Sequence, residues 1–212
     1  MPHAKIEIGL DEGALEAFVA CPSGSGRYAP ILLLSGREGI TRATESRAMR
    51  LSAHNFFVLA PDLSGRSAEA RREAAWAALD HLEDDPRVDD ARVGVLGFGS
   101  GADLALVLAA WRAERIAAVA AYGGRGFGPR TAVEIAERIN GLIRIGYVVG
   151  HVPARAGLLE QALARAGVMF DIEVCEAEPA WSDLVDLFGR VLAPAAARRS
   201  LADGARPTTS AL

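Results

Sequence analysis

The feature that most constrains the fold is a set of three alternating glycines between a buried strand and a long apolar helix. The residues Val93–Leu96 form a short, continuous apolar run, which is typical of a strand buried in a parallel sheet. Gly97, Gly99 and Gly101 follow, and residues 102–111 are apolar and helix-forming. A strand, a tight glycine turn and a buried helix are the setting of a nucleophile elbow, with the pattern glycine, any residue, nucleophile, any residue, glycine. The third position, where the nucleophile belongs, is Gly99 here.

Strand-like and helix-like segments alternate along the chain around this turn. Two segments with alternating polarity, 5–10 and 14–21, predict an N-terminal hairpin. The later segments predict an α/β fold with a doubly wound, mostly parallel sheet, to which the hairpin adds an antiparallel edge. The predicted strands are 30–34, 56–60, 93–96, 116–122, 142–149 and 170–175, and the predicted helices are 42–53, 68–82, 102–111, 132–139, 154–166 and 180–192.

Length and composition limit the organisation and the partners. The 212 residues predict a single domain over 1–193, followed by a poorly ordered tail over 194–212 that is rich in Ala, Arg, Ser, Pro and Thr. The net charge of −4 argues against nucleic acid and anionic membranes as partners. No apolar run approaches the roughly 20 residues of a membrane span, and no signal peptide is recognisable, so a cytoplasmic location is expected. Cys21 and Cys175 are too isolated to predict a disulfide framework or a metal site, and no cofactor is expected.

Several motifs together resemble the dienelactone hydrolase family of α/β-hydrolases, over roughly residues 14–192. The matching stretches are the apolar strand 30–34, the Ala-Pro-Asp-Leu run within 57–63, the turn 86–89, the strand and first glycine at 93–97, and the segments 159–163 and 166–168. The resemblance implies an α/β-hydrolase fold. It also implies a Cys or Ser at the elbow, an Asp after the next-to-last strand, a His after the last strand, and a Glu after the third strand.

The chain departs from the family at all four of these positions. The elbow residue is Gly99, the Asp loop 148–153 holds no carboxylate, and the His loop 176–181 holds no histidine. The glutamate position falls at Gly36, with Glu38 two residues further on. An elbow strains its central residue by about 1–3 kcal/mol unless that residue is glycine, so Gly99 is what a site without a nucleophile would favour. The covalent hydrolytic mechanism of the family is therefore not expected here.

Four side chains near the predicted carboxyl edge of the sheet are candidate acids or bases: Glu38, His151, Glu176 and Glu178. Each has a structural alternative. Glu38 could pair with Arg37 at the surface, and His151 could be a solvated or capping residue of its loop. Glu176 and Glu178 beside Trp181 could hold a carboxyl with a raised pKa, or could belong to a solvated loop.

The candidate binding residues are Gly36, Arg37, Gly99, Ser100, Arg66, Phe127 and Trp181. The resemblance implies that the backbone around Gly36, Arg37, Gly99 and Ser100 provides the N–H groups that face an oxyanion. Ser100 is either a residue of the first helical turn or a substitute nucleophile, which would need a base within hydrogen-bond reach. Arg66 resembles the arginine that family members use near the substrate carboxylate. Residues 123–128 predict a flexible glycine-rich loop over the pocket, with Phe127 lining it.

These residues support three hypotheses for function. The first is a non-hydrolytic enzyme that acts on a small carbonyl compound, such as a cyclase, isomerase or dehydratase that tailors a natural product. The second is a non-catalytic binding protein, for which a homodimer is one arrangement. The third is a divergent serine hydrolase that uses Ser100.

Overall fold

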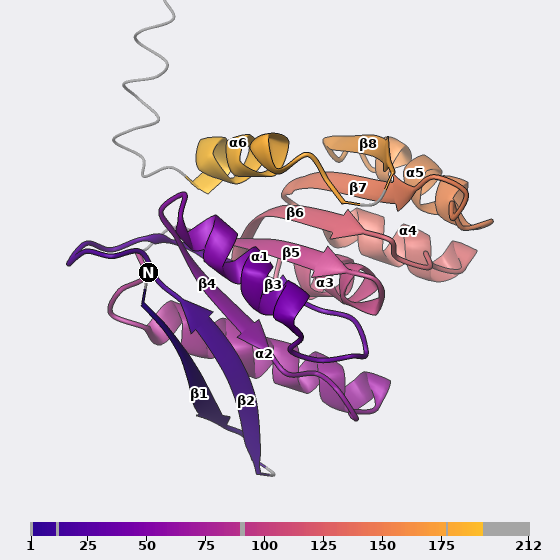
Figure 1. Cartoon of the computed structure of the whole chain (residues 1–212). Coiled ribbons are helices and arrows are strands. Elements are labelled where there is room, and N and C mark those ends of the chain that lie inside the picture. Colours follow the sequence, from indigo (N-terminus) through magenta and orange to yellow (C-terminus); the bar gives the residue numbers. More distant parts are fainter. Residues whose placement is uncertain (1, 12, 90–91, 177, 193–212) are drawn as a thin grey trace, which may run out of the picture.

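A single sheet of eight strands forms the centre of the molecule (Figure 1). The structure is a computed structural model of the chain, and it describes residues 2–11, 13–89, 92–176 and 178–192. The strands are β1 (His3–Gly9), β2 (Ala14–Ala20), β3 (Ala29–Leu34), β4 (Phe56–Pro61), β5 (Val93–Phe98), β6 (Ile116–Tyr122), β7 (Leu142–Val148) and β8 (Phe170–Cys175). Their spatial order is β1-β2-β4-β3-β5-β6-β7-β8. The pairs β1–β2 and β2–β4 are antiparallel and the remaining pairs are parallel, which confirms the predicted α/β-hydrolase fold with an antiparallel N-terminal edge.

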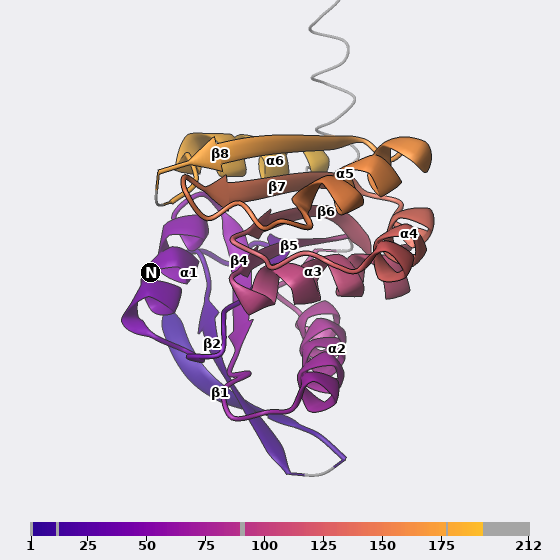
Figure 2. The ribbon, with the colours of Figure 1, turned by 90° about the vertical axis from the view of Figure 1, so that its right-hand side faces the viewer.

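Helices cover both faces of the sheet (Figure 1 and Figure 2). The helices are α1 (Arg42–Ser52), α2 (Ala68–Asp84), α3 (Ser100–Trp111), α4 (Pro129–Arg138), α5 (Ala156–Arg165) and α6 (Trp181–Leu192). One face packs against α1 and α6, and the other packs against α2, α3, α4 and α5. This is the arrangement expected when parallel strands are joined by helical crossovers.

Local sequence signals explain where the helices near the site begin. Thr41 and Thr44 form a capping box at the start of α1, since each side chain accepts a hydrogen bond from the backbone of the other. The Ser67 hydroxyl accepts the Ala70 N–H at 3.2 Å and caps α2. Because each helix follows a parallel strand, these N-termini lie at the carboxyl edge of the sheet.

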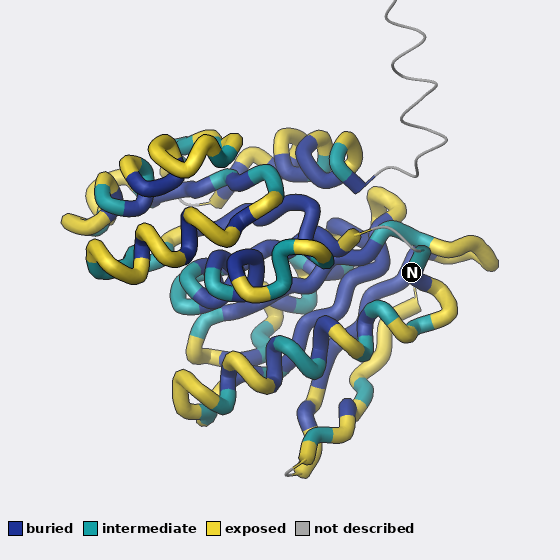
Figure 3. The backbone as a smooth tube through the Cα atoms, turned by 180° about the vertical axis from the view of Figure 1, so that it is seen from behind, coloured by how far each residue is buried: buried dark blue, intermediate teal, exposed yellow. Residues whose placement is uncertain are grey.

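The strands carry the core, as the burial of the backbone in Figure 3 shows. All six residues of β4 and all seven of β6 are buried. Small residues let the layers approach one another, as at Gly94, where an added Cβ would lie 2.7 Å from the Phe188 ring on α6. The predicted elements agree with these elements to within three residues at either end.

The structure tests the predictions about the chain as a whole only in part. The predicted tail, 194–212, lies outside the described residues, so the single domain over 1–193 stays a prediction. Among the described helices, none has the length and apolar character to cross a bilayer. The cytoplasmic location and the homodimer also stay predictions.

Two glycines let the β5–α3 turn press against β3. A Cβ added at Gly101 would lie 2.2 Å from the carbonyl oxygen of Leu34, which is the last residue of β3. A Cβ added at Gly97 would lie 2.4 Å from the carbonyl oxygen of Gly101. Both obstacles are backbone atoms, so neither can swing aside. The contact requires glycine at both positions and fixes the start of α3 against the loop that follows β3.

We predict that Gly101→Ala lowers the free energy of unfolding by about 1–3 kcal/mol, the usual range for overpacking. The matched control is Gly157→Ala in α5, where an added Cβ meets nothing within 4 Å. That control should gain up to about 1 kcal/mol, because alanine is the better helix former. Urea denaturation measures both values, and an unchanged stability in Gly101→Ala would contradict the close contact with β3.

Candidate functional site

The turn between β5 and α3 keeps the backbone of a nucleophile elbow although its central residue is glycine. Gly99 has φ 55° and ψ −123°, which lies in the left-handed half of backbone space that favours glycine. Its N–H donates to the Tyr122 carbonyl at 2.8 Å, and its own carbonyl accepts the Ala102 N–H at 3.0 Å. A Cβ added at Gly99 would meet nothing within 4 Å. The elbow therefore points into open space, with a hydrogen in the place of a side chain.

That space is a pocket of about 570 Å³ at the carboxyl ends of β3, β5 and β6, here called the elbow pocket. The loop after β3 brings Gly36, Arg37 and Glu38 into its wall, and the elbow brings Gly99 and Ser100. Five of the predicted site residues thus lie together. The pocket is lined by Ser35, Gly36, Arg37, Glu38, Gly39, Thr41, Ala43, Thr44, Arg47, Phe98, Gly99, Ser100, Gly123 and Arg125.

Two serine hydroxyl groups in the lining of the elbow pocket have no hydrogen-bond partner among the described residues. The Ser35 side chain is buried, and the hydroxyl oxygens of Ser35 and Ser100 are covered without any hydrogen bond to a described residue. A serine becomes a nucleophile through a base within hydrogen-bond reach, and nothing in the described part of the chain provides one to Ser100. Glu38 brings a carboxylate to the wall of the pocket and is exposed to solvent there.

One wall of the elbow pocket is a stack of charged and aromatic side chains. The Arg47 guanidinium lies 3.9 Å from the centre of the Phe98 ring, and that ring stacks on Tyr122 at 5.7 Å between centroids. Glu178 pairs with Arg47, whose Nε donates to it at 3.2 Å, and also accepts the Trp181 Nε1–H at 3.3 Å. Glu178 and Trp181 therefore support this wall from behind Arg47 and do not line the pocket.

The glycine-rich loop after β6 is tied to α3 by one carboxylate. The two oxygens of Asp103 accept the backbone N–H groups of Arg125 at 3.0 Å and Gly126 at 3.1 Å. Burial raises the pKa of the Asp103 carboxyl, and these two hydrogen bonds oppose part of the rise. These two hydrogen bonds attach the centre of the loop to α3, and its flexibility stays a prediction. Phe127 packs partly buried against the core on the α2–α5 face rather than into the elbow pocket.

A second pocket, of about 510 Å³, lies between α2 and α3 and shares Arg37, Ser100 and Arg125 with the elbow pocket. We call it the arginine pocket, because four of its residues are arginines. It is lined by Arg37, Ala68, Glu69, Arg71, Arg72, Ser100, Asp103, Leu104, Val107 and Arg125. Arg71 and Asp103 were not among the residues predicted from the sequence. The available signal was the position of Arg71 in the apolar stripe of α2, at 71, 74, 75, 78, 79 and 82.

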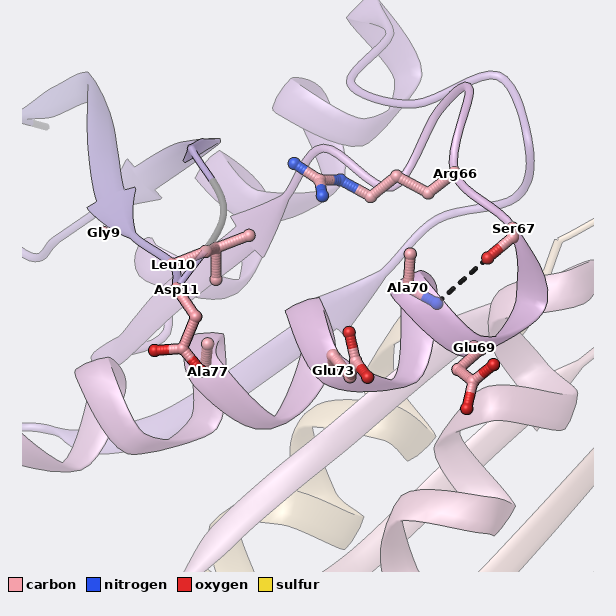
Figure 4. Close-up of a pocket in the computed structure, with 9 residues that line it drawn as sticks. All are labelled: Gly9, Leu10, Asp11, Arg66, Ser67, Glu69, Ala70, Glu73 and Ala77. Atoms are coloured by element: carbon pink, nitrogen blue, oxygen red, sulfur yellow. Dashed lines mark hydrogen bonds between the residues drawn. The ribbon is translucent and has the colours of Figure 1, made fainter.

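The other predicted residues lie away from the elbow pocket. Arg66 donates to the Ala14 carbonyl at 3.1 Å and lines a pocket of about 940 Å³ between the hairpin and α2 (Figure 4). His151 is exposed and faces its own loop, where its Nδ1 lies 3.3 Å from the Val149 carbonyl oxygen. Glu176 is exposed in the loop after β8. Catalytic roles for His151 and Glu176 stay predictions.

Metal binding finds no support in the described ranges of the chain. Within 2–11, 13–89, 92–176 and 178–192, no three residues of the types His, Cys, Asp and Glu gather in a way that could hold a metal ion. The polar groups of the site are instead arginines, backbone N–H groups and isolated carboxylates. These groups bind anions and carbonyl oxygens.

Known proteins resemble this chain in sequence over about half of its length. The family model for the dienelactone hydrolase family matches residues 69–180. Acyl-coenzyme A thioesterase 6 of Mus musculus is 34% identical over 117 residues, which are 52% of this chain and 27% of that protein. Acyl-coenzyme A amino acid N-acyltransferase 2 of the same organism is 29% identical over 120 residues, 54% of this chain and 28% of that protein. The chain thus spans just over a quarter of the length of these mouse relatives.

Solved structures of the same fold cover nearly the whole chain. A dienelactone hydrolase from Anabaena variabilis superposes with a TM-score of 0.73 at 20% identity, covering 90% of this chain and 98% of that one. A dienelactone hydrolase-like promiscuous phosphotriesterase from metagenomic libraries gives a TM-score of 0.77 at 19% identity, covering 90% and 98%. At such identities these structures show the fold alone. Since the family model matches more than half of the sequence, this chain belongs to the dienelactone hydrolase family.

Proposed function

We propose that this chain binds a small carbonyl-containing molecule over Gly99 and converts it without hydrolysis. The observation that carries the proposal is the elbow itself, which has the backbone of a nucleophile elbow and open space above it but no side chain. A carbonyl carbon placed there meets no attacking atom from residue 99. The chemistry left to such a site is stabilisation of negative charge on the carbonyl oxygen.

Backbone N–H groups from two elements are the proposed donors to that oxygen. Ser100 is the first residue of α3, so its N–H has no carbonyl partner within the helix. Gly36 and Arg37 line the same pocket from the loop after β3, and the contact between Gly101 and Leu34 holds that loop against the elbow. Fixed N–H dipoles of this kind stabilise an enolate as well as a tetrahedral oxyanion.

Glu38 is the proposed base. It would take a proton from the carbon next to the carbonyl, and the electron pair of that C–H bond would move to the carbonyl oxygen as an enolate. Return of the proton to another carbon gives isomerisation, loss of a β-hydroxyl as water gives dehydration, and attack of the enolate carbon within the same molecule gives cyclisation. Each outcome balances without an oxidant or a covalent enzyme intermediate. Tailoring of a natural product is the setting in which we place these reactions.

The names of the mouse relatives support a carbonyl substrate, and the word thioesterase in one of them refers to a hydrolysis. Both names refer to acyl-coenzyme A, and an acyl group presents a carbonyl to its enzyme. In this chain the elbow residue is Gly99, and among the described residues no histidine lines the elbow pocket. A shared carbonyl site with different chemistry is consistent with both facts.

A second candidate function is binding without catalysis. The observation that favours it is the state of Glu38, which is exposed and has no hydrogen bond to a described residue that would orient it. A base acts efficiently when its position is fixed, so an unoriented carboxylate weakens the case for proton transfer. The two candidates differ in whether bound molecules exchange protons.

We predict that Gly99→Ser produces a less stable protein without esterase activity. The side chain has room, but the backbone angles of this residue should lower the free energy of unfolding by about 1–3 kcal/mol. Hydrolysis of p-nitrophenyl acetate should stay at the background rate, because no histidine is among the described residues that line the elbow pocket. The control Gly189→Ser, on the exposed side of α6, should change stability by less than about 0.5 kcal/mol. Rapid ester hydrolysis by Gly99→Ser would show that a base does reach the elbow.

Proton exchange tests the proposed function directly. We expect the protein to accelerate the exchange of α-hydrogens for deuterium in at least one small oxo acid, such as pyruvate, 2-oxoglutarate or levulinate, as followed by proton NMR in D2O. Glu38→Gln should slow that exchange by about 10²-fold or more, the usual contribution of a general base. Glu137→Gln on the exposed side of α4 is the matched control and should leave the rate unchanged.

Three outcomes would contradict the proposal. Unchanged exchange in Glu38→Gln would remove Glu38 as the base. Binding of the oxo acids without any exchange would favour the second candidate. Covalent labelling of the protein by a fluorophosphonate, lost in Ser100→Ala, would instead establish a serine hydrolase.

A further inference from the structure

Arg71 occupies a core position in α2 at the end nearest the site. The buried positions of this helix recur at the spacing of one helical face, and Arg71 is the first of them, followed by Ala74, Ala75 and Ala78. An arginine at the start of such a stripe points inward, beside the carboxyl edge of the sheet. Its exposed fraction is 8%, and the side chain lies in the wall of the arginine pocket.

The guanidinium of Arg71 has no anionic partner in the described part of the chain. Its Nε and Nη2 atoms are covered and make no hydrogen bond to any described residue. An arginine does not escape this situation by losing its proton, so it remains a charge in a poorly solvated place. Buried charges in proteins are ordinarily paired, and a charge without a protein partner points to a partner that comes from outside.

The other charged groups of the arginine pocket leave positive charge in excess. The Arg72 Nη2 atom lies 3.9 Å from the Glu69 Oε1 atom, and Asp103 already accepts hydrogen bonds from two backbone N–H groups. Arg37 is exposed in the pocket wall, close enough for its charge to act on Arg71. Burial lowers the pKa of the Arg71 guanidinium, and the charge of Arg37 lowers it further. An anion bound between two like charges that face one cavity reduces the repulsion between them.

We propose that the arginine pocket binds an anionic group, a carboxylate or a phosphate, on the same small molecule whose carbonyl lies over Gly99. This inference rests on the proposed function for the carbonyl. The two pockets share Arg37, Ser100 and Arg125, so one molecule can extend from one into the other. Arg71 is the residue that defines the anion subsite, and Arg37 assists it from the shared wall. The substrate class is thereby narrowed to oxo acids or oxo phosphates.

The residues of this subsite differ from the arginine that the family resemblance suggests for binding a carboxylate. That position is Arg66, whose side chain donates to the Ala14 carbonyl beside the hairpin. Arg66 lines the pocket between the β1–β2 hairpin and α2, and it lines neither the elbow pocket nor the arginine pocket. Figure 4 shows it directed across the N-terminal end of α2 toward the hairpin. An anion bound in the arginine pocket would therefore contact Arg71 and Arg37 and not Arg66.

Binding of matched acids and esters tests the subsite. The probes are levulinate and 5-oxohexanoate, each against its methyl ester, and dihydroxyacetone phosphate against dihydroxyacetone, with Kd measured by isothermal titration calorimetry. We expect the charged member of at least one pair to bind about tenfold more tightly or better, since hydrogen bonds to a charged group carry that difference. Arg71→Met should abolish the discrimination, Arg71→Lys should restore part of it, and Arg130→Met, an exposed arginine of α4, should retain it.

Arg37→Met provides a second variant in case Arg71→Met does not fold, and it should weaken the discrimination because Arg37 is exposed and assists the same anion. Equal affinity of acid and ester in every pair, or discrimination that survives both Arg71→Met and Arg37→Met, would overturn the inference.

Preference for the oxo acids identifies a carboxylate and preference for the oxo phosphate identifies a phosphate, and either supports the subsite. Discrimination without deuterium exchange would support the subsite while the proposed catalysis fails. Deuterium exchange in neutral ketones, with equal affinity for acids and esters, would support the proposed catalysis while the anion subsite fails.

Discussion

The packing of Gly101 against the end of β3 is the contact on which the rest of the site depends. A methyl group at this position would collide with the Leu34 carbonyl oxygen, so α3 begins closer to β3 than any other residue would allow. This approach brings the N–H of Ser100 and the loop from Gly36 to Glu38 to one pocket. It also shows that the elbow conformation does not depend on a nucleophile. Glycine at 99 is free to adopt many conformations, and the neighbouring contacts hold it in this one.

An elbow held by its neighbours explains how a member of a hydrolase family can lack the nucleophile and keep the site. In an enzyme with Ser or Cys at this position, backbone strain and catalysis are coupled, because the strain presents the reactive atom. In this chain Gly99 removes the strain and the reactive atom together, while the pocket above it stays open. The donors on either side are backbone groups, so the loss of a side chain leaves them in place. Polarisation of a carbonyl is therefore the property that such a site retains most easily.

The sequence predicted the fold more completely than the site, for physical reasons that particular residues show. The strands and helices carry local periodicity, and Gly36, Arg37, Glu38, Gly99 and Ser100 directly follow strand ends, so their convergence follows from the parallel sheet. The partnership of Arg47 and Glu178 joins residues 131 positions apart and carries no local signal. Arg71 was missed because arginines in amphipathic helices ordinarily face solvent. Only its place in the apolar stripe of α2 distinguishes it from Arg72, which is exposed.

In the proposed function, the two pockets at the elbow would bind different parts of one molecule, its carbonyl group and its anionic group. Arginines line both pockets, and the elbow pocket adds the carboxylate of Glu38, the Phe98 ring and the open backbone at Gly99. A molecule anchored by its anionic end has few orientations left, and restricted orientation accelerates a reaction within that molecule without any covalent step. An anion bound at Arg71 would also offset the desolvation of that arginine, so the proposed binding would stabilise the folded protein. A nucleophile would be unnecessary in the proposed arrangement, because the orientation of the bound molecule would accelerate the reaction in place of a side chain at position 99.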